Sequence, residues 1–301
     1  MKLFLTGATG FVGTNLSSFL SKNNYHISSQ RFSQFYFDNN FAESNAIIHL
    51  AGKAHDLKKS VNSEEYYLAN TDFSKLVFDL FLKSDAKIFI TLSSVKAVAD
   101  VVNGELTEET SPNPITHYGK SKLLAEQYIL SQEIPKGKRV YILRPCMIHG
   151  KGNKGNLNLL YKLITLSVPW PLGAFENNRS FCSIDNLMFI VKELLEREDI
   201  PSGIYNIADD EALSTNEVIS IIAKSQNRIP IIWNMPKKLI NLIAKFGDVL
   251  KLPLNTERLI KLTESYVVNN SKIKKAIGKP LPISATEGLF KTFQSFDSKK
   301  I

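Results

Sequence analysis

Short apolar runs alternate with amphipathic stretches through the first half of the chain. The runs are rich in β-branched and aromatic residues, are apolar on both faces, and end in small or polar residues, which predicts buried β-strands. They lie at 2–7, 26–30, 45–52, 87–94 and 139–145. Between them, 12–23 and 71–84 have the apolar spacing of helices. This order predicts right-handed βαβ units and a doubly wound parallel α/β sheet.

The alternation loosens after Arg144 and Pro145. A helical pattern and a Pro-rich stretch fill 155–178, and 203–208 again resembles a sheet strand. Two further helices are predicted by capping boxes, Ser214 with Glu217 and Ser284 with Glu287. We therefore expect a sheet domain of 1–155 plus about 181–208, and a smaller mixed domain of about 156–180 plus 209–301.

The apolar residues of 73–83 extend beyond a single stripe. Phe73, Leu76, Val77, Leu80 and Phe81 share one helical face, while Phe78 and Leu82 fall elsewhere. These two residues either belong to a broad core stripe or form a subunit interface.

Composition narrows the compartment and the chemistry. Cys146 and Cys182 lie far apart outside any CxxC pattern, so we expect neither disulfides nor a metal site, as in a reducing cytoplasm. Only three apolar residues follow Lys2 before the first glycine, too few for a signal peptide. No apolar run approaches the roughly 20 residues that span a bilayer, so we expect no membrane partner.

The formal charge of +8 raises the possibility of nucleic-acid binding. The basic residues are scattered, however, and no nucleic-acid-binding motif accompanies the one cluster, which lies within 272–279. We expect no nucleic-acid partner, because this charge suits an acidic small-molecule ligand equally well.

The turn after the first strand, TGATGFVG, has the spacing of a dinucleotide fingerprint. Glycines there allow a tight turn and let the backbone approach a pyrophosphate at a helix N-terminus. The candidate cofactor-binding residues are Gly7, Gly10, Phe11, Val12 and Gly13.

The second strand bears on the choice of cofactor. An acidic residue at its end accepts hydrogen bonds from an NAD ribose, whereas an arginine accommodates the 2′-phosphate of NADP. Here the strand ends with Ser28, Ser29 and Arg31 and carries no acid. We therefore favour NADP(H) and keep NAD(H) as possible, since Arg31 could equally be a solvated surface residue.

A catalytic group is predicted from two further motifs. Tyr118 and Lys122 stand four apart at the start of a helix and so share one face. A lysine ammonium beside a tyrosine favours the phenolate and lowers the phenol pKa. Ser93 and Ser94 close a predicted strand at the sheet edge where ligands bind.

Together these motifs resemble the extended short-chain dehydrogenase/reductases that act on nucleotide sugars. TGATGFVG, IIHLAGKAHD, SSVKA and YGKSK match their glycine, fourth-strand, serine and Tyr-x-x-x-Lys motifs, and Asn70 sits at their structural asparagine. LRPCMIHGKGNKGNL is similar to RPxxxYGPG with His149 replacing tyrosine. NNRSFCSIDNL and SKIKKAIGKPLPISATEGL extend the resemblance over nearly the whole chain. It is strongest to bacterial UDP-glucose or UDP-N-acetylglucosamine 4-epimerases and related 4-ketosugar reductases of surface-polysaccharide synthesis.

The resemblance implies roles for particular residues. Ala51, Gly52 and Lys53 would line the cofactor in the dinucleotide-binding sheet domain. Ser94, supported by Ser93, would contact the reacting oxygen of a UDP-linked sugar. The other substrate-binding candidates lie in or beside the smaller domain: Asn156, Arg179 and Arg258. A homodimer is also implied.

The missing acid of the second strand favours a 4-reductase. In this hypothesis NADPH delivers hydride to the C4 ketone of a UDP-linked, N-acetylated 6-deoxyhexose, Tyr118 gives the proton, and Lys122 tunes Tyr118 and holds the nicotinamide ribose. The alternative is an NAD-dependent 4-epimerase that uses the same three residues in both directions. A 4,6-dehydratase would want an Asp-Glu pair where Val95 and Lys96 stand. A non-catalytic dinucleotide sensor would need the glycines but not Ser94, Tyr118 and Lys122.

Overall fold

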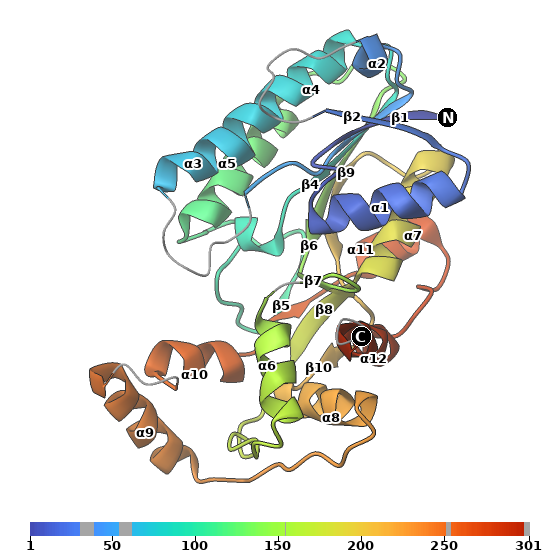
Figure 1. Cartoon of the computed structure of the whole chain (residues 1–301). Helices are drawn as coiled ribbons and strands as arrows, with labels where there is room; N and C mark the ends of the chain where they lie inside the picture. Colours follow the sequence, from blue (N-terminus) through green and yellow to red (C-terminus); the bar gives the residue numbers. More distant parts are fainter. Residues whose placement is uncertain (31–38, 54–61, 154, 251–253, 298–301) are drawn as a thin grey trace.

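Six parallel strands form the central sheet of the computed structural model, which describes residues 1–30, 39–53, 62–153, 155–250 and 254–297. Their order is β2-β1-β3-β4-β6-β9 (Figure 1), and every neighbouring pair is parallel. The predicted doubly wound α/β sheet is confirmed. The strands are β1 Lys2–Thr6, β2 His26–Gln30, β3 Ala46–His49, β4 Ile88–Leu92, β6 Arg139–Pro145 and β9 Gly203–Ile207.

Successive side chains of the strands enter two separate cores, because a strand alternates its faces. Leu3 and Leu5 pack in one core, and Phe4 between them packs in the other. The first core is covered by α1 Phe11–Lys22, α7 Ile184–Glu196 and α11 Ser271–Ile277. On the opposite face lie α2 Asn39–Ala42, α3 Ser63–Tyr67, the π-helix η1 Leu68–Asp72, α4 Phe73–Lys83 and α5 His117–Ser131 (Figure 1).

The packing of helix α4 decides whether Phe78 and Leu82 belong to the core or to a subunit interface. Phe78 is fully buried, and its ring centroid lies 5.0 Å from that of Phe89 on β4. Leu82 is half-buried against the same core. The interface interpretation is therefore wrong for Phe78, because the sheet itself covers this side of α4. The expected homodimer stays a prediction that rests on the resemblance alone.

The second half of the chain builds a smaller mixed sheet and its own hydrophobic core. Strand β8 pairs parallel with β7 and antiparallel with β10. The capping box of Ser214 and Glu217 opens α8, and the Ser284 hydroxyl accepts a hydrogen bond from the Glu287 N–H as α12 begins. The strands are β7 Met147–His149, β8 Arg179–Ser183 and β10 Ala212–Leu213, and β5 Glu105–Leu106 pairs separately with β11 Val267–Val268. The helices are α6 Asn156–Thr165, α8 Thr215–Ser225, α9 Lys237–Leu250, α10 Thr256–Thr263 and α12 Ala285–Asp297.

The strand order reverses direction at β1, which has β2 on one side and β3 on the other. In open α/β sheets the loops at such a switch point part and leave a crevice beyond the carboxyl ends of the strands. The glycine turn follows β1, the segment 51–53 follows β3, and Ser93 and Ser94 follow β4. The topology therefore gathers these motifs at one edge of the sheet.

A buried ion pair fixes α5 to the sheet at this edge. Arg144 of β6 donates to both carboxylate oxygens of Glu126 on α5, at 2.5–3.1 Å. Both side chains are almost fully buried. The Ser93 hydroxyl donates to the same carboxylate, so helix and strands meet in one polar contact.

We predict that Glu126→Ala lowers the free energy of unfolding by about 3–5 kcal/mol, because the Arg144 guanidinium would stay buried without its partner. Urea denaturation monitored by circular dichroism measures this change. Glu133→Ala, at an exposed position just after α5, is the matched control and should change little. A loss below about 1 kcal/mol for Glu126→Ala would show that the pair does not hold the helix.

Candidate functional site

The glycine turn between β1 and α1 is shaped by the chain's own packing. Gly7 has a left-handed φ of +74°, and a Cβ there would lie 2.6 Å from the backbone nitrogen of Ala51. A Cβ on Gly13 would lie 2.7 Å from Cα of Ala8. At Gly10 a Cβ would meet only the Gly7 carbonyl oxygen, at 3.3 Å. Gly7 and Gly13 thus close the turn, and Gly10 leaves its outer side open.

The N-terminus of α1 is the feature of this turn that suits an anion. Gly10 caps the helix without a side-chain hydrogen bond, and no acidic residue stands in the first turn. Phe11 and Val12 are half-buried and pack against the sheet core, so what they can offer a ligand is their backbone N–H groups. Backbone N–H groups at a helix start are the usual partners of a pyrophosphate, which fits the predicted dinucleotide.

The segment after β3 joins the turn to the catalytic helix through Asn70. The Asn70 side chain accepts a hydrogen bond from the Lys53 N–H at 2.8 Å and donates to the Lys53 carbonyl at 3.1 Å. It also donates to the Ser121 hydroxyl of α5 at 3.0 Å. A Cβ on Gly52 would lie 3.1 Å from Nζ of Lys122. The same Cβ would lie 2.7 Å from Oδ1 of Asn70, so glycine leaves room for both side chains at this point.

The structure brings Tyr118 and Ser94 together. Thr116 caps α5 by accepting a hydrogen bond from the Gly119 N–H, and the Asp100 carboxylate accepts two backbone N–H bonds just before it. This anchoring sets Tyr118 in the first turn. Burial raises the pKa of Tyr118, and a hydrogen bond with Ser94 opposes that rise. The Ser94 hydroxyl, in turn, accepts a hydrogen bond from the Lys96 N–H at 3.2 Å.

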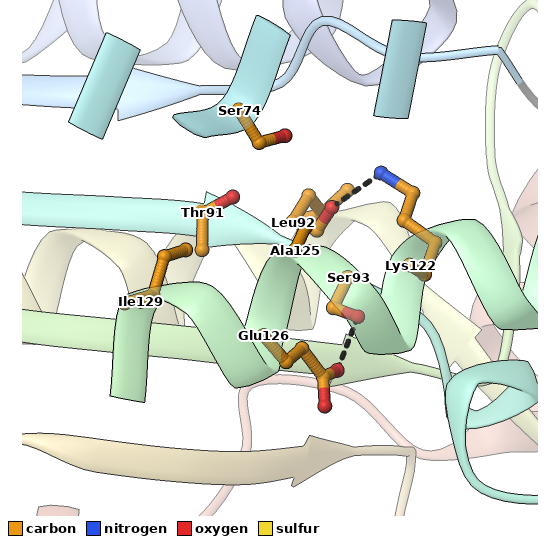
Figure 2. Close-up of a pocket in the computed structure, with 8 residues that line it drawn as sticks. All are labelled: Ser74, Thr91, Leu92, Ser93, Lys122, Ala125, Glu126 and Ile129. Atoms are coloured by element: carbon orange, nitrogen blue, oxygen red, sulfur yellow. Dashed lines mark hydrogen bonds between the residues drawn. The ribbon is translucent and has the colours of Figure 1, made fainter. Parts of the chain in front are cut away.

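Lys122 is buried one helical turn further along α5. Its Nζ donates to the Leu92 carbonyl at 2.9 Å (Figure 2). Burial lowers the pKa of Lys122 to about 8, and the nearby Glu126 carboxylate partly opposes this. Burial is the largest influence on the Tyr118 pKa in this structure, and the effect of Lys122 on that pKa stays a prediction.

Ser93 has a different environment from Ser94. Figure 2 shows its hydroxyl directed at Glu126, to which it donates inside the core. The predicted supporting contact of Ser93 with substrate is therefore not favoured by the structure. Of the pair, Ser94 is the residue beside Tyr118.

The remaining predicted substrate residues are spread over the second half. Arg179 opens β8, where its guanidinium donates to the Lys261 carbonyl and lies 3.8 Å from the Glu264 carboxylate. Burial lowers the pKa of Arg179, and Glu264 opposes this. Arg258 is exposed on α10, the helix that also carries Lys261, and Asn156 is exposed at the start of α6. Arg31 lies outside the described residues.

The structure gives His149 and Glu126 structural roles that the sequence motifs do not indicate. His149 is fully buried, hydrogen-bonded through Nδ1 to the Thr292 hydroxyl at 2.9 Å, with Nε2 3.4 Å from the Asp209 carboxylate. It therefore braces β7 against α12. Glu126 follows Lys122 by four residues, and this helical spacing indicates that the two side chains are close. No such spacing in the sequence indicates that Arg144 pairs with Glu126.

Comparison with known proteins identifies relatives of this chain. Residues 3–208 match the profile of the "NAD dependent epimerase/dehydratase family". The chain is 28% identical to a UDP-glucose 4-epimerase of Vibrio cholerae over 98% of this chain and 95% of that protein. It is 26% identical to an N-acetyl-α-D-glucosaminyl-diphospho-undecaprenol 4-epimerase of Escherichia coli, covering 97% and 94%.

A solved structure shares the fold. The crystal structure of UDP-glucuronic acid 4-epimerase from Bacillus cereus in complex with NAD superposes with a TM-score of 0.77 at 19% identity, covering 99% of both chains. The match of more than half the chain to the family profile, together with the open glycine turn and the Ser94–Tyr118 contact, shows that this chain belongs to the NAD dependent epimerase/dehydratase family.

Proposed function

We propose that this enzyme is a 4-epimerase of a UDP-linked hexose or N-acetylhexosamine that retains its NAD. The observation that carries the proposal is that Ser94, which follows β4 at the sheet edge, lies against Tyr118 of α5. Both curated relatives described above are named 4-epimerases of glucosyl or N-acetylglucosaminyl substrates, which favours this reading over the reductase expected from the second strand.

Tyr118 is the proposed acid–base group. It takes the proton of the C4 hydroxyl as the C4–H bond breaks and returns it when the C4–H bond forms again, while Ser94 hydrogen-bonds the same oxygen. Bound NAD would supply the hydride acceptor at C4 and a positively charged ring that favours the Tyr118 phenolate. This positive charge would oppose the effect of burial, which raises the Tyr118 pKa.

Lys122 is proposed to position the cofactor. Its Nζ lies next to Gly52, whose segment follows β3 at the switch point, and it is held there by the Leu92 carbonyl. An ammonium at this point can donate to ribose hydroxyls without moving away from the sheet. Residues 156–180 and 209–301 are proposed to hold the sugar nucleotide, with Arg179 as the first candidate for its diphosphate.

The other reactions receive less support. Val95 is buried, and Lys96 donates to the Asp100 carbonyl with its Nζ 4.2 Å from the Tyr266 ring centroid, so neither position offers a dehydratase carboxylate. The 4-reductase stays as the second candidate for one reason. Strand β2 has the sequence HISSQ and presents no acid to a ribose, and Ser28 donates to the Leu3 carbonyl.

Tyr118→Phe should lower kcat for UDP-hexose epimerisation by about 10²–10⁴-fold, because the proton acceptor is lost. Tyr128→Phe is the matched control: it removes a hydroxyl from the same helix, one that donates to Asp79 at 2.6 Å. Turnover is measured by separating the two UDP-sugars chromatographically. A Tyr118→Phe enzyme with nearly normal kcat would remove Tyr118 from the mechanism.

The dependence of kcat/KM on pH should reflect the ionisation of Lys122. Its pKa is lowered to about 8, so the side chain is an ammonium below that pH and a neutral amine above it. Since the proposed role needs the charge, kcat/KM should fall as pH rises through about 8. Lys122→Met should lack this limb, and Lys120→Met, at an exposed position on the same helix, should keep it. A wild-type profile that stays level well above pH 8 would contradict the assignment.

The cofactor separates the two candidate reactions. We expect the purified protein to release stoichiometric NAD on denaturation, identified by mass spectrometry, and to convert UDP-hexose without added cofactor. Release of NADP, or an empty site that takes up NADPH in preference to NADH, would instead establish the reductase and give Arg31 its predicted role.

A further inference from the structure

Helix α9 has two apolar faces, and only one of them is covered. Ile240, Ala244 and Gly247 are buried against the core of the second half. The second face, here called the α9 face, consists of six large side chains that are 37–78% exposed: Leu239, Leu242, Ile243, Phe246, Val249 and Leu250.

The α9 face is continuous. At 100° per residue, its six side chains fall within an arc of about 120°, and no charged residue lies inside that arc. Lys238 and Lys245 border one edge of this arc, and Asn241 and Asp248 lie on the opposite side of the helix. A folded protein rarely leaves an apolar surface of this kind to water unless something covers it.

The position of α9 leaves this face accessible. Helices α9 and α10 project from the body of the molecule, at the lower left of Figure 1, away from the central sheet. The two helices are in contact, and Ala244 of α9 and Leu259 of α10 are buried in one core, which covers the inner side of α9.

Charge identifies the partner. Helices α9 and α10 carry five basic and two acidic side chains. The acidic ones are occupied: Asp248 accepts the N–H and hydroxyl of Thr256, and Glu257 pairs with Lys261. Within the described residues, Lys238 and Lys245 form no ion pair, and both are exposed beside the α9 face. A two-fold contact with a second copy would bring these lysines toward their own equivalents, whereas an anionic surface attracts them.

We propose that the α9 face docks this enzyme on the surface of an anionic lipid bilayer. The 14 residues of α9 extend about 21 Å, short of the roughly 30 Å of hydrocarbon, so the helix would lie in the interface rather than cross it. No helix in the described part of the chain is long and apolar enough to span. The expectation of no membrane partner rested on the absence of a spanning segment, and a surface-bound helix needs none.

Docking through α9 would bring the proposed sugar-nucleotide half of the enzyme to the membrane. The central sheet and the glycine turn would face the aqueous side. The inference goes beyond the proposed function and does not depend on it, because lipid binding requires neither cofactor nor turnover.

Flotation of the full-length protein with vesicles tests the proposal. Wild type should float with phosphatidylcholine vesicles that contain phosphatidylglycerol, and more weakly with phosphatidylcholine alone. Phe246→Glu should weaken vesicle binding by about tenfold or more, because it places a charge at the centre of the α9 face, which the bilayer would bury. The double variant Lys238→Glu/Lys245→Glu should lose mainly the preference for anionic vesicles.

Leu130→Glu is the matched control. Leu130 is 57% exposed on α5 and Phe246 is 58% exposed on α9, so both variants put a carboxylate on an exposed apolar position. Leu130→Glu should float like wild type, and circular dichroism of all variants checks the fold. The proposal is overturned if wild type stays in solution with both vesicle types. It is equally overturned if light scattering shows a wild-type dimer that Phe246→Glu reduces to a monomer, since the α9 face would then belong to a second copy.

Discussion

The buried pair of Glu126 and Arg144 is the contact on which the candidate site depends. An ion pair removed from water is tolerated only when its remaining hydrogen-bonding capacity is filled. Here the Glu126 carboxylate accepts hydrogen bonds from both the Arg144 guanidinium and the Ser93 hydroxyl. Because α5 also carries Tyr118 and Lys122, and Ser94 follows Ser93, this one contact sets the catalytic helix against the end of β4. It also keeps a negative charge near Lys122, which opposes the effect of burial on the lysine pKa.

A second polar junction connects this helix to the cofactor side of the sheet. Asn70 is fully buried and bonds both the segment after β3 and Ser121 of α5. It lies in a π-helical turn between α3 and α4, a widened turn that is frequent at functional sites. The same arrangement explains the close approach at Gly52, where a side chain would collide with Asn70. The backbone at Gly52, the position of α5 and the position of Lys122 therefore depend on one another.

The two halves of the molecule use apolar residues differently. In the first half, apolar strand residues and helices form cores on both faces of the sheet, and the broad apolar stripe of α4 belongs to one of them. In the second half, α9 has more apolar surface than the small core can cover. Six exposed apolar side chains lie together on α9 with two lysines along one edge, so they form a surface of defined chemistry.

The sequence by itself determined the parallel sheet, because alternating strands and helices allow few other arrangements, and it determined Gly7, Ser94, Tyr118 and Lys122 as chemical candidates through local spacing. Local spacing does not say what lies across the fold. Only the tertiary structure directed the Ser93 hydroxyl to Glu126, buried Phe78 and directed the ammonium of Lys122 to a carbonyl. It also showed that one apolar side of α9 is covered and the other is not. Each of these outcomes depends on groups distant in sequence, such as Glu126 for Ser93, and the pattern of neighbouring residues does not indicate them.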